Sequence, residues 1–114
     1  MSQQLEDQFY KFAEGTRDFC RQVKWDVINL EYIKQLIRAS GSVGANYLEA
    51  SDSLGTADEK MKLKIARCEA KESMHWLSLI LVYEFQHLKN HRIALLNEAE
   101  QIRKILSTII TKLG

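Results

Sequence analysis

Apolar and polar positions alternate with a helical period along almost the whole chain. Apolar side chains recur every three or four residues in four separate stretches, which is typical of amphipathic helices. The helices predicted from this period cover about residues 5–23, 30–53, 57–89 and 93–113. Short connections between them favour an all-α fold, an antiparallel up-down-up-down four-helix bundle formed by one domain over residues 1–114.

Capping residues set the expected helix boundaries. Asn29 is a candidate N-cap for the second helix, and Thr56 and Glu59 have the spacing of a capping box at the start of the third. Asn90 and His91 are the residues expected to form the turn into the fourth helix.

The third predicted helix has three distinct faces. The first carries only cations, which we call the cation row: Lys60, Lys64, Arg67 and Lys71. The second is largely apolar and comprises Met61, Ile65, Cys68, Glu72, Trp76 and Leu79. The third is also largely apolar and comprises Leu63, Ala66, Ala70, Ser73, Leu77 and Leu81. A helix of an isolated bundle needs one apolar stripe, so we expect one face to meet the core and the other a neighbouring subunit. A central helix in a monomer is the alternative.

Two glycines interrupt the second predicted helix. Gly41 and Gly44 lie in the stretch QLIRASGSVGANYLEAS, residues 35–51. Each should destabilise a helix interior by roughly 1 kcal/mol relative to alanine. The other small residues of the stretch are Ala39, Ser40, Ser42 and Ala45. We therefore expect another backbone to pack closely against this helix.

Composition agrees with a single helical domain. The 114 residues are 46% hydrophobic, which is enough for one core, and the absence of proline argues against a sheet protein with many tight turns. No apolar run is long enough to span a membrane, and the N-terminus does not resemble a secretion signal, so we expect a cytoplasmic protein. Cys20 and Cys68 lack the spacing of a metal or redox motif, and we expect both to be buried reduced thiols.

Two central segments carry a family resemblance. The stretch at residues 35–51 is followed, after a short loop, by KLKIARCEAKESMHWL, and EAEQIRKILSTIITKL lies near the C-terminus. In these segments the chain resembles the bacterial four-helix bundle family named for 23S rRNA intervening sequences. The resemblance implies an up-and-down bundle that assembles into a homopentamer. Genes of that family lie within intervening sequences of large-subunit ribosomal RNA as well as elsewhere, which makes RNA a partner to consider.

The motif positions of that family fall on polar residues of the two central helices. They are Gln35, Arg38, Ser42, Asn46 and Glu49 in the second helix and Glu69, Glu72, Trp76 and Leu77 in the third. Glu72 interrupts an apolar stripe, and its burial would be unfavourable without a cationic partner such as Arg38. We interpret the set as a polar network that fixes helix register, with a ligand-contacting site as the alternative.

Catalytic and metal chemistry find little support in the sequence. The pairs Glu72 with His75 and Glu84 with His87 have the spacing used in di-iron bundles, but both fall on the third predicted helix, whereas such a site draws its ligands from all four helices. Neither cysteine has a histidine and acid arranged around it, and no glycine-rich phosphate loop follows a strand. We therefore expect a non-enzymatic protein without metal or cofactor.

Two functional hypotheses remain. The first is a homo-oligomeric adapter that contacts RNA or an RNA-bound protein through the cation row, together with Arg17 and Arg21 on the first helix. The second is a protein-interaction or structural scaffold whose charged rows are only solvated faces. The formal net charge of +1 does not decide between them.

Overall fold

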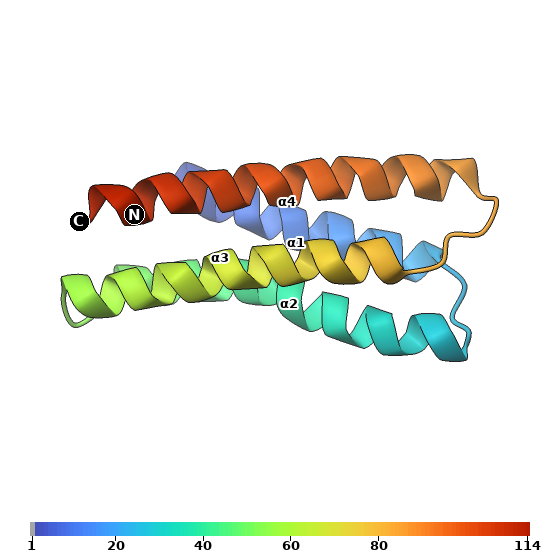
Figure 1. Ribbon diagram of the computed structural model, residues 1–114, viewed down its shortest axis with the longest axis horizontal. Helices are drawn as coiled ribbons and strands as arrows, with labels where there is room; N and C mark the ends of the chain where they lie inside the picture. The colour runs from blue at the N-terminus through green and yellow to red at the C-terminus, as the bar shows by residue number, and fades with distance from the viewer. Residues whose placement is uncertain (1) are drawn as a thin grey trace.

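Four antiparallel helices make up the computed structural model, which describes residues 2–114 (Figure 1). They are α1 (Gln3–Gln22), α2 (Val27–Ser51), α3 (Thr56–Leu79) and α4 (Gln86–Lys112). The bundle measures 47 × 22 × 19 Å, and the start of α1 and the end of α4 lie at the same end of the bundle as the α2–α3 connection (Figure 1). The predicted all-α, up-down-up-down fold is confirmed. Within the described residues, no helix has the length and apolar character needed to cross a membrane.

Each helix packs against two neighbours. α1 contacts α2 and α4, α3 contacts the same two helices, and α1 therefore lies diagonally opposite α3. The largest fully buried side chains come from all four helices: Phe9, Phe12, Phe19, Leu36, Val43, Tyr47, Leu63, Leu77, Leu88, Ile102 and Leu106. The rings of Phe9 and Tyr47 meet edge to face with centroids 4.9 Å apart, an arrangement that aromatic pairs favour. This core fixes which face of each helix points outward.

The predicted boundary between the last two helices is wrong. α3 ends at Leu79 rather than near residue 89, the connection covers residues 80–85, and Asn90 and His91 lie inside α4. No glycine or proline marks this connection, so the local sequence gave no stop signal. Tyr83 instead adopts a left-handed backbone conformation, with φ of 55°, which is uncommon for a non-glycine residue.

A buried asparagine holds the two connections at this end together. The Asn29 side chain donates to the carbonyls of Lys24 and Leu81, both at 2.9 Å, and accepts from the Leu81 amide at 2.8 Å. Asn29 is thus not the N-cap of α2. Asp26 is the cap: its side chain accepts from the Asn29 amide at 2.8 Å and from the Tyr83 hydroxyl. The Asn29 amide and then the Tyr83 hydroxyl lower the pKa of the Asp26 carboxyl.

The start of α3 also differs from the prediction. Thr56 is the first helical residue and not the cap, which is Gly55 with φ of 138°. An L side chain rarely adopts that angle, so glycine suits this position. No side chain of the described residues caps α3, and the Asp58 carboxylate of its first turn accepts instead from the Leu54 amide, which precedes the cap, at 3.2 Å.

The two glycines of α2 have different surroundings. A Cβ built at Gly44 would lie 3.5 Å from the Cβ of Phe9, so α1 packs closely here as expected. A Cβ at Gly41 would have no neighbour within 4 Å among the described residues. The expectation of a close neighbour is therefore wrong for Gly41 within one chain.

The two apolar faces of α3 also have different surroundings. The face of α3 that meets the core is the one with Leu63, Ala66, Ala70, Ser73 and Leu77, all of which are buried. Leu81 lies beyond the helix and is partly exposed.

The second apolar face remains on the surface. Met61, Ile65 and Cys68 form an exposed line that we call the ridge, whereas Trp76 is half-buried against Tyr32. The prediction that both cysteines are buried is therefore wrong for Cys68. Cys20 is buried, and that burial raises the pKa of its thiol to about 12.

Candidate nucleic-acid interface

The cation row runs along α3 on the side that faces α4. Lys64 and Lys71 are exposed, whereas Lys60 and Arg67 are half-buried. The Arg67 guanidinium donates to the Ser107 hydroxyl of α4 at 3.2 Å. Among residues 2–114, no acidic side chain forms an ion pair with any of the four. The row is therefore a surface of uncompensated positive charge.

Hydroxyl groups of α4 extend this surface, and sequence analysis missed them. Ser107, Thr108, Thr111 and Lys112 line a shallow groove of about 310 Å³. The Arg67–Ser107 hydrogen bond connects the groove to the cation row. Hydroxyls and cations are both phosphate ligands in nucleic-acid complexes. The signal that could have found the hydroxyls was their spacing of four residues at 107 and 111, which places them on one helix face.

The two other candidate cations lie elsewhere. Arg17 and Arg21 are exposed on α1, which is diagonal to α3 and makes no contact with it. Arg17 also pairs with Asp18 at 3.3 Å. The structure therefore does not bring them together with the cation row.

The predicted polar network lies along the seam between α2 and α3. Two ion pairs cross the seam: Arg38 with Glu69 and Glu49 with Lys62, each at 3.9 Å. The Ser42 hydroxyl and the Asn46 amide instead donate to carbonyls of their own helix, and Gln35 is exposed. The network is thus smaller than the set of motif residues.

Glu69, and not Glu72, is the acid that the fold partly buries. Its side chain is 14% exposed, and its Oε2 atom is buried without a hydrogen-bond partner among the described residues. Desolvation raises the pKa of the Glu69 carboxyl, the negative charge of Glu72 adds to this, and Arg38 opposes it. Glu72, for which sequence analysis named Arg38 as the candidate partner, is exposed on the outer face of α3, and Arg38 pairs with Glu69 instead.

The two Glu-x-x-His pairs do not form a metal site. The prediction that both pairs share one helix is wrong, because Glu84 lies in the connection after α3. The Glu84 side chain is almost fully exposed. No group of three or more metal-ligating side chains gathers anywhere in the described part of the chain.

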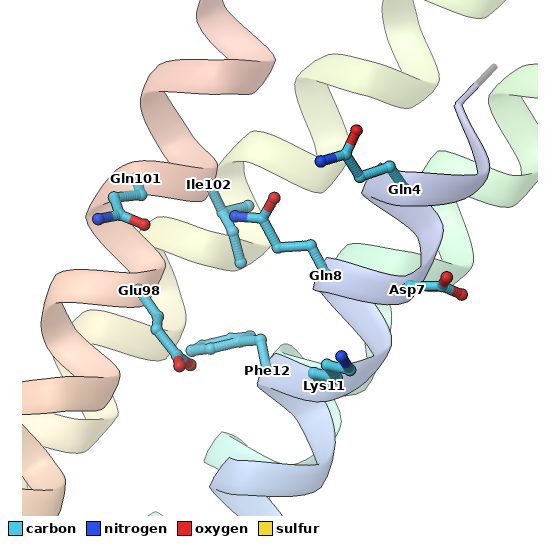
Figure 2. Close-up of a pocket in the computed structure, with 8 residues that line it drawn as sticks. All are labelled: Gln4, Asp7, Gln8, Lys11, Phe12, Glu98, Gln101 and Ile102. Atoms are coloured by element: carbon cyan, nitrogen blue, oxygen red, sulfur yellow. The ribbon is translucent and has the colours of Figure 1, made fainter.

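A groove of about 450 Å³ lies between α1 and α4 (Figure 2). Phe12 and Ile102 form its buried floor, and its walls carry the amides of Gln4, Gln8 and Gln101 with Asp7, Lys11 and Glu98. The Glu98 carboxylate lies beside the Phe12 ring (Figure 2), and desolvation raises its pKa while the charge of His91 opposes the shift. The lining contains no nucleophile next to a base, so the groove carries no argument for catalysis.

Comparison with known proteins places the chain in a family. The family model described as 23S rRNA-intervening sequence protein matches residues 3–108. The chain belongs to this family. No curated protein matches.

One solved structure supports the same assignment. It is a protein with unknown function from the S23 ribosomal protein family of Bacteroides thetaiotaomicron VPI-5482. It is 30% identical, with a TM-score of 0.79, over 92% of this chain and 96% of that chain. As a 23S rRNA-intervening sequence protein, the chain thus shares its bundle with a relative whose own function is unknown.

Proposed function

We propose that this protein is a non-enzymatic, homo-oligomeric adapter that binds the phosphate backbone of RNA through the cation row. The observation that carries the proposal is that Lys60, Lys64, Arg67 and Lys71 have no acidic partner within the described chain. Cations that are not neutralised internally can release counterions from a phosphate backbone when they bind it. The family membership points to RNA as the polyanion.

Self-association is the second part of the proposal. The ridge leaves three apolar residues on the surface of α3, and Met61 is 61% exposed. Exposed apolar patches of this kind mark interaction surfaces. The family resemblance suggests a pentamer, in which five copies of a weak cationic site would bind one RNA with avidity. Such an assembly would act in the cytoplasm.

RNA binding measured against salt tests the proposal. Binding of the protein to a labelled single-stranded RNA should weaken steeply between about 50 and 200 mM salt and should depend little on base sequence. Changing all four row residues to glutamine should abolish binding and leave helix content and native mass unchanged, because glutamine is a good helix former.

A matched variant controls for net charge. Arg17, Lys34, Lys89 and Arg103 each already pair with an acid, at Asp18, Glu31, Glu84 and Glu100 respectively. Changing these four to glutamine removes the same charge, and binding should persist. If the row variant binds as well as the control, or if the unchanged protein binds no RNA at low salt, the RNA proposal is wrong.

The second candidate is a scaffold without nucleic-acid binding. The exposed ridge favours it, since a surface that mediates self-assembly needs no further ligand. A native assembly that fails to bind RNA in the experiment above would support this alternative.

A further inference from the structure

Exposed aromatic side chains gather at one end of the bundle. Four aromatic residues are exposed in the described chain, and three of them belong to the two connections at this end, residues 23–26 and 80–85 (Figure 1). We call these three the aromatic patch: Trp25, Tyr83 and Phe85, which are 61%, 43% and 55% exposed. The Asn29 side chain bonds to both connections, so it holds the two parts of the patch at the same end.

Tyr83 is held in place although its ring adds little to the core. Its backbone has the left-handed φ of 55°, which is unfavourable for a residue with a side chain. The Tyr83 hydroxyl donates to the Asp26 carboxylate, and Asn29 fixes Leu81 two residues earlier. Strained backbone positions that the surrounding structure enforces cluster at functional sites. The fold therefore presents this ring to solvent in a defined position.

A cation lies over the same ring. The Lys24 ammonium group is 5.7 Å from the centroid of the Tyr83 ring, within the range of a cation–π contact. Lys24 is exposed, and no acidic side chain among residues 2–114 forms an ion pair with it. Proteins that bind single-stranded nucleic acid combine these two groups, a ring on which a base stacks and a cation for the phosphate.

The cation row leads toward this end of the bundle. Counting 100° per residue, the line of the row continues past Lys71 to Ser78, with His75 beside it and no acid on it. Both Ser78 and His75 are exposed. α3 ends at Leu79, about 12 Å along the helix from Lys71, and the connection that carries two rings of the patch begins there. A strand whose phosphates follow the row therefore reaches the aromatic patch.

We propose that the aromatic patch is a stacking surface for the bases of single-stranded RNA whose phosphates lie on the cation row. This inference rests on the proposed RNA binding and names the part of the RNA that the row does not contact. Stacking on aromatic side chains is tolerant of base identity, so it agrees with the weak sequence dependence expected of the row. It does require unpaired bases, because the bases of a duplex already stack on their neighbours. The protein should therefore bind single-stranded RNA more tightly than duplex RNA of the same length.

A polyanion without bases separates the two surfaces. Inorganic polyphosphate carries phosphate charge but nothing that can stack on a ring. The double variant Tyr83→Leu, Phe85→Leu should lose affinity for a labelled single-stranded RNA by about tenfold or more, because base–aromatic stacking is lost. Its affinity for polyphosphate should stay unchanged. The variant with glutamine at all four row positions should lose affinity for both polyanions.

Three further variants control for folding and for the loss of an exposed ring. Tyr10→Leu removes an aromatic side chain that is 66% exposed on α1, far from the patch, and should leave RNA binding unchanged. Tyr83→Phe removes the hydroxyl that bonds to Asp26 but keeps the ring, and should retain RNA binding. Phe85→Leu alone leaves that hydrogen bond intact and should show part of the loss even if the double variant does not fold.

The outcomes distinguish a failure of stacking from a failure of RNA binding. Loss of RNA affinity with unchanged polyphosphate affinity supports the stacking surface. Unchanged RNA affinity in the patch variants, or equal affinity of the unchanged protein for single-stranded and duplex RNA, would overturn it and leave the cation row as the RNA site. A changed native mass in the patch variants would assign the patch to contacts between subunits and would also overturn it. Failure of the unchanged protein to bind either polyanion would overturn both proposals.

Discussion

The inward and outward faces of α2 and α3 carry the same residue types in very different settings. Leu77 is buried in the core whereas Leu79 is partly exposed, and Gly44 packs on Phe9 whereas Gly41 faces open space. The apolar period of the sequence shows that both faces of α3 are suited to contact. It does not show what each face contacts, because burial depends on which helices of the same or another chain lie opposite.

The leucine pair should give the largest contrast. Leu77→Ala removes a fully buried side chain and should lower the free energy of unfolding by about 2–5 kcal/mol. Leu79→Ala should lower it much less, because that side chain is already 38% exposed. Denaturant titrations at one fixed protein concentration would measure both, since assembly makes stability concentration-dependent. Equal losses would contradict the assignment of the two faces.

The asparagine pair tests the connection that sequence analysis misplaced. Asn29→Ala would leave the Lys24 carbonyl and the Leu81 amide and carbonyl without their partner and should destabilise the fold by about 1–3 kcal/mol. Asn46→Ala loses only a bond to the Ser42 carbonyl of its own helix and should have a smaller effect. Faster amide hydrogen exchange in residues 80–85 of the first variant alone would locate the damage. Unchanged exchange there would contradict the role of Asn29.

The glycine pair separates contacts within the chain from contacts between chains. Gly44→Leu presses a side chain against Phe9 and should destabilise the fold by about 1–3 kcal/mol. A Cβ at position 41 would have no neighbour within 4 Å among the described residues, so Gly41→Leu should be neutral or stabilising by up to about 1 kcal/mol in the monomer. Native mass measurement should show that Gly41→Leu nevertheless dissociates the assembly. A stable, fully assembled Gly41→Leu protein would contradict a role for Gly41 in self-association.

The glutamate pair should give the smallest effect, visible in the pH dependence of stability. Burial raises the pKa of Glu69 in the folded state, so the folded protein binds more protons than the unfolded one in the acid range. Stability from this group therefore decreases as the pH rises through that range. Glu69→Gln should remove this decrease, whereas Glu72→Gln should change the pH profile less. Thermal unfolding at several pH values would measure it, and identical profiles for Glu69→Gln and the unchanged protein would contradict the prediction.

Much of the fold could be predicted from local pattern, and the errors share a cause. The helical period identified four helices and the two apolar faces of α3, but not which of these faces meets the core. The end of α3 was missed because residues 80–85 lack glycine and proline, and because the Asn29 contacts to Leu81 come from a residue 52 positions away. Glu72 was singled out as the candidate partner of Arg38 because it interrupts an apolar stripe. The rotation of α3 against α2 brings Glu69 to Arg38 instead.

By itself, the sequence determined that the chain forms four helices around one core and that α3 carries an unpaired cation row, because helical period and charge spacing are local properties. Only the tertiary structure decided that the ridge is uncovered, that Gly41 faces open space, and that Arg17 and Arg21 lie apart from the row. These facts depend on which helix faces lie opposite one another. That choice comes from side-chain packing over the whole bundle, which no short stretch of sequence contains.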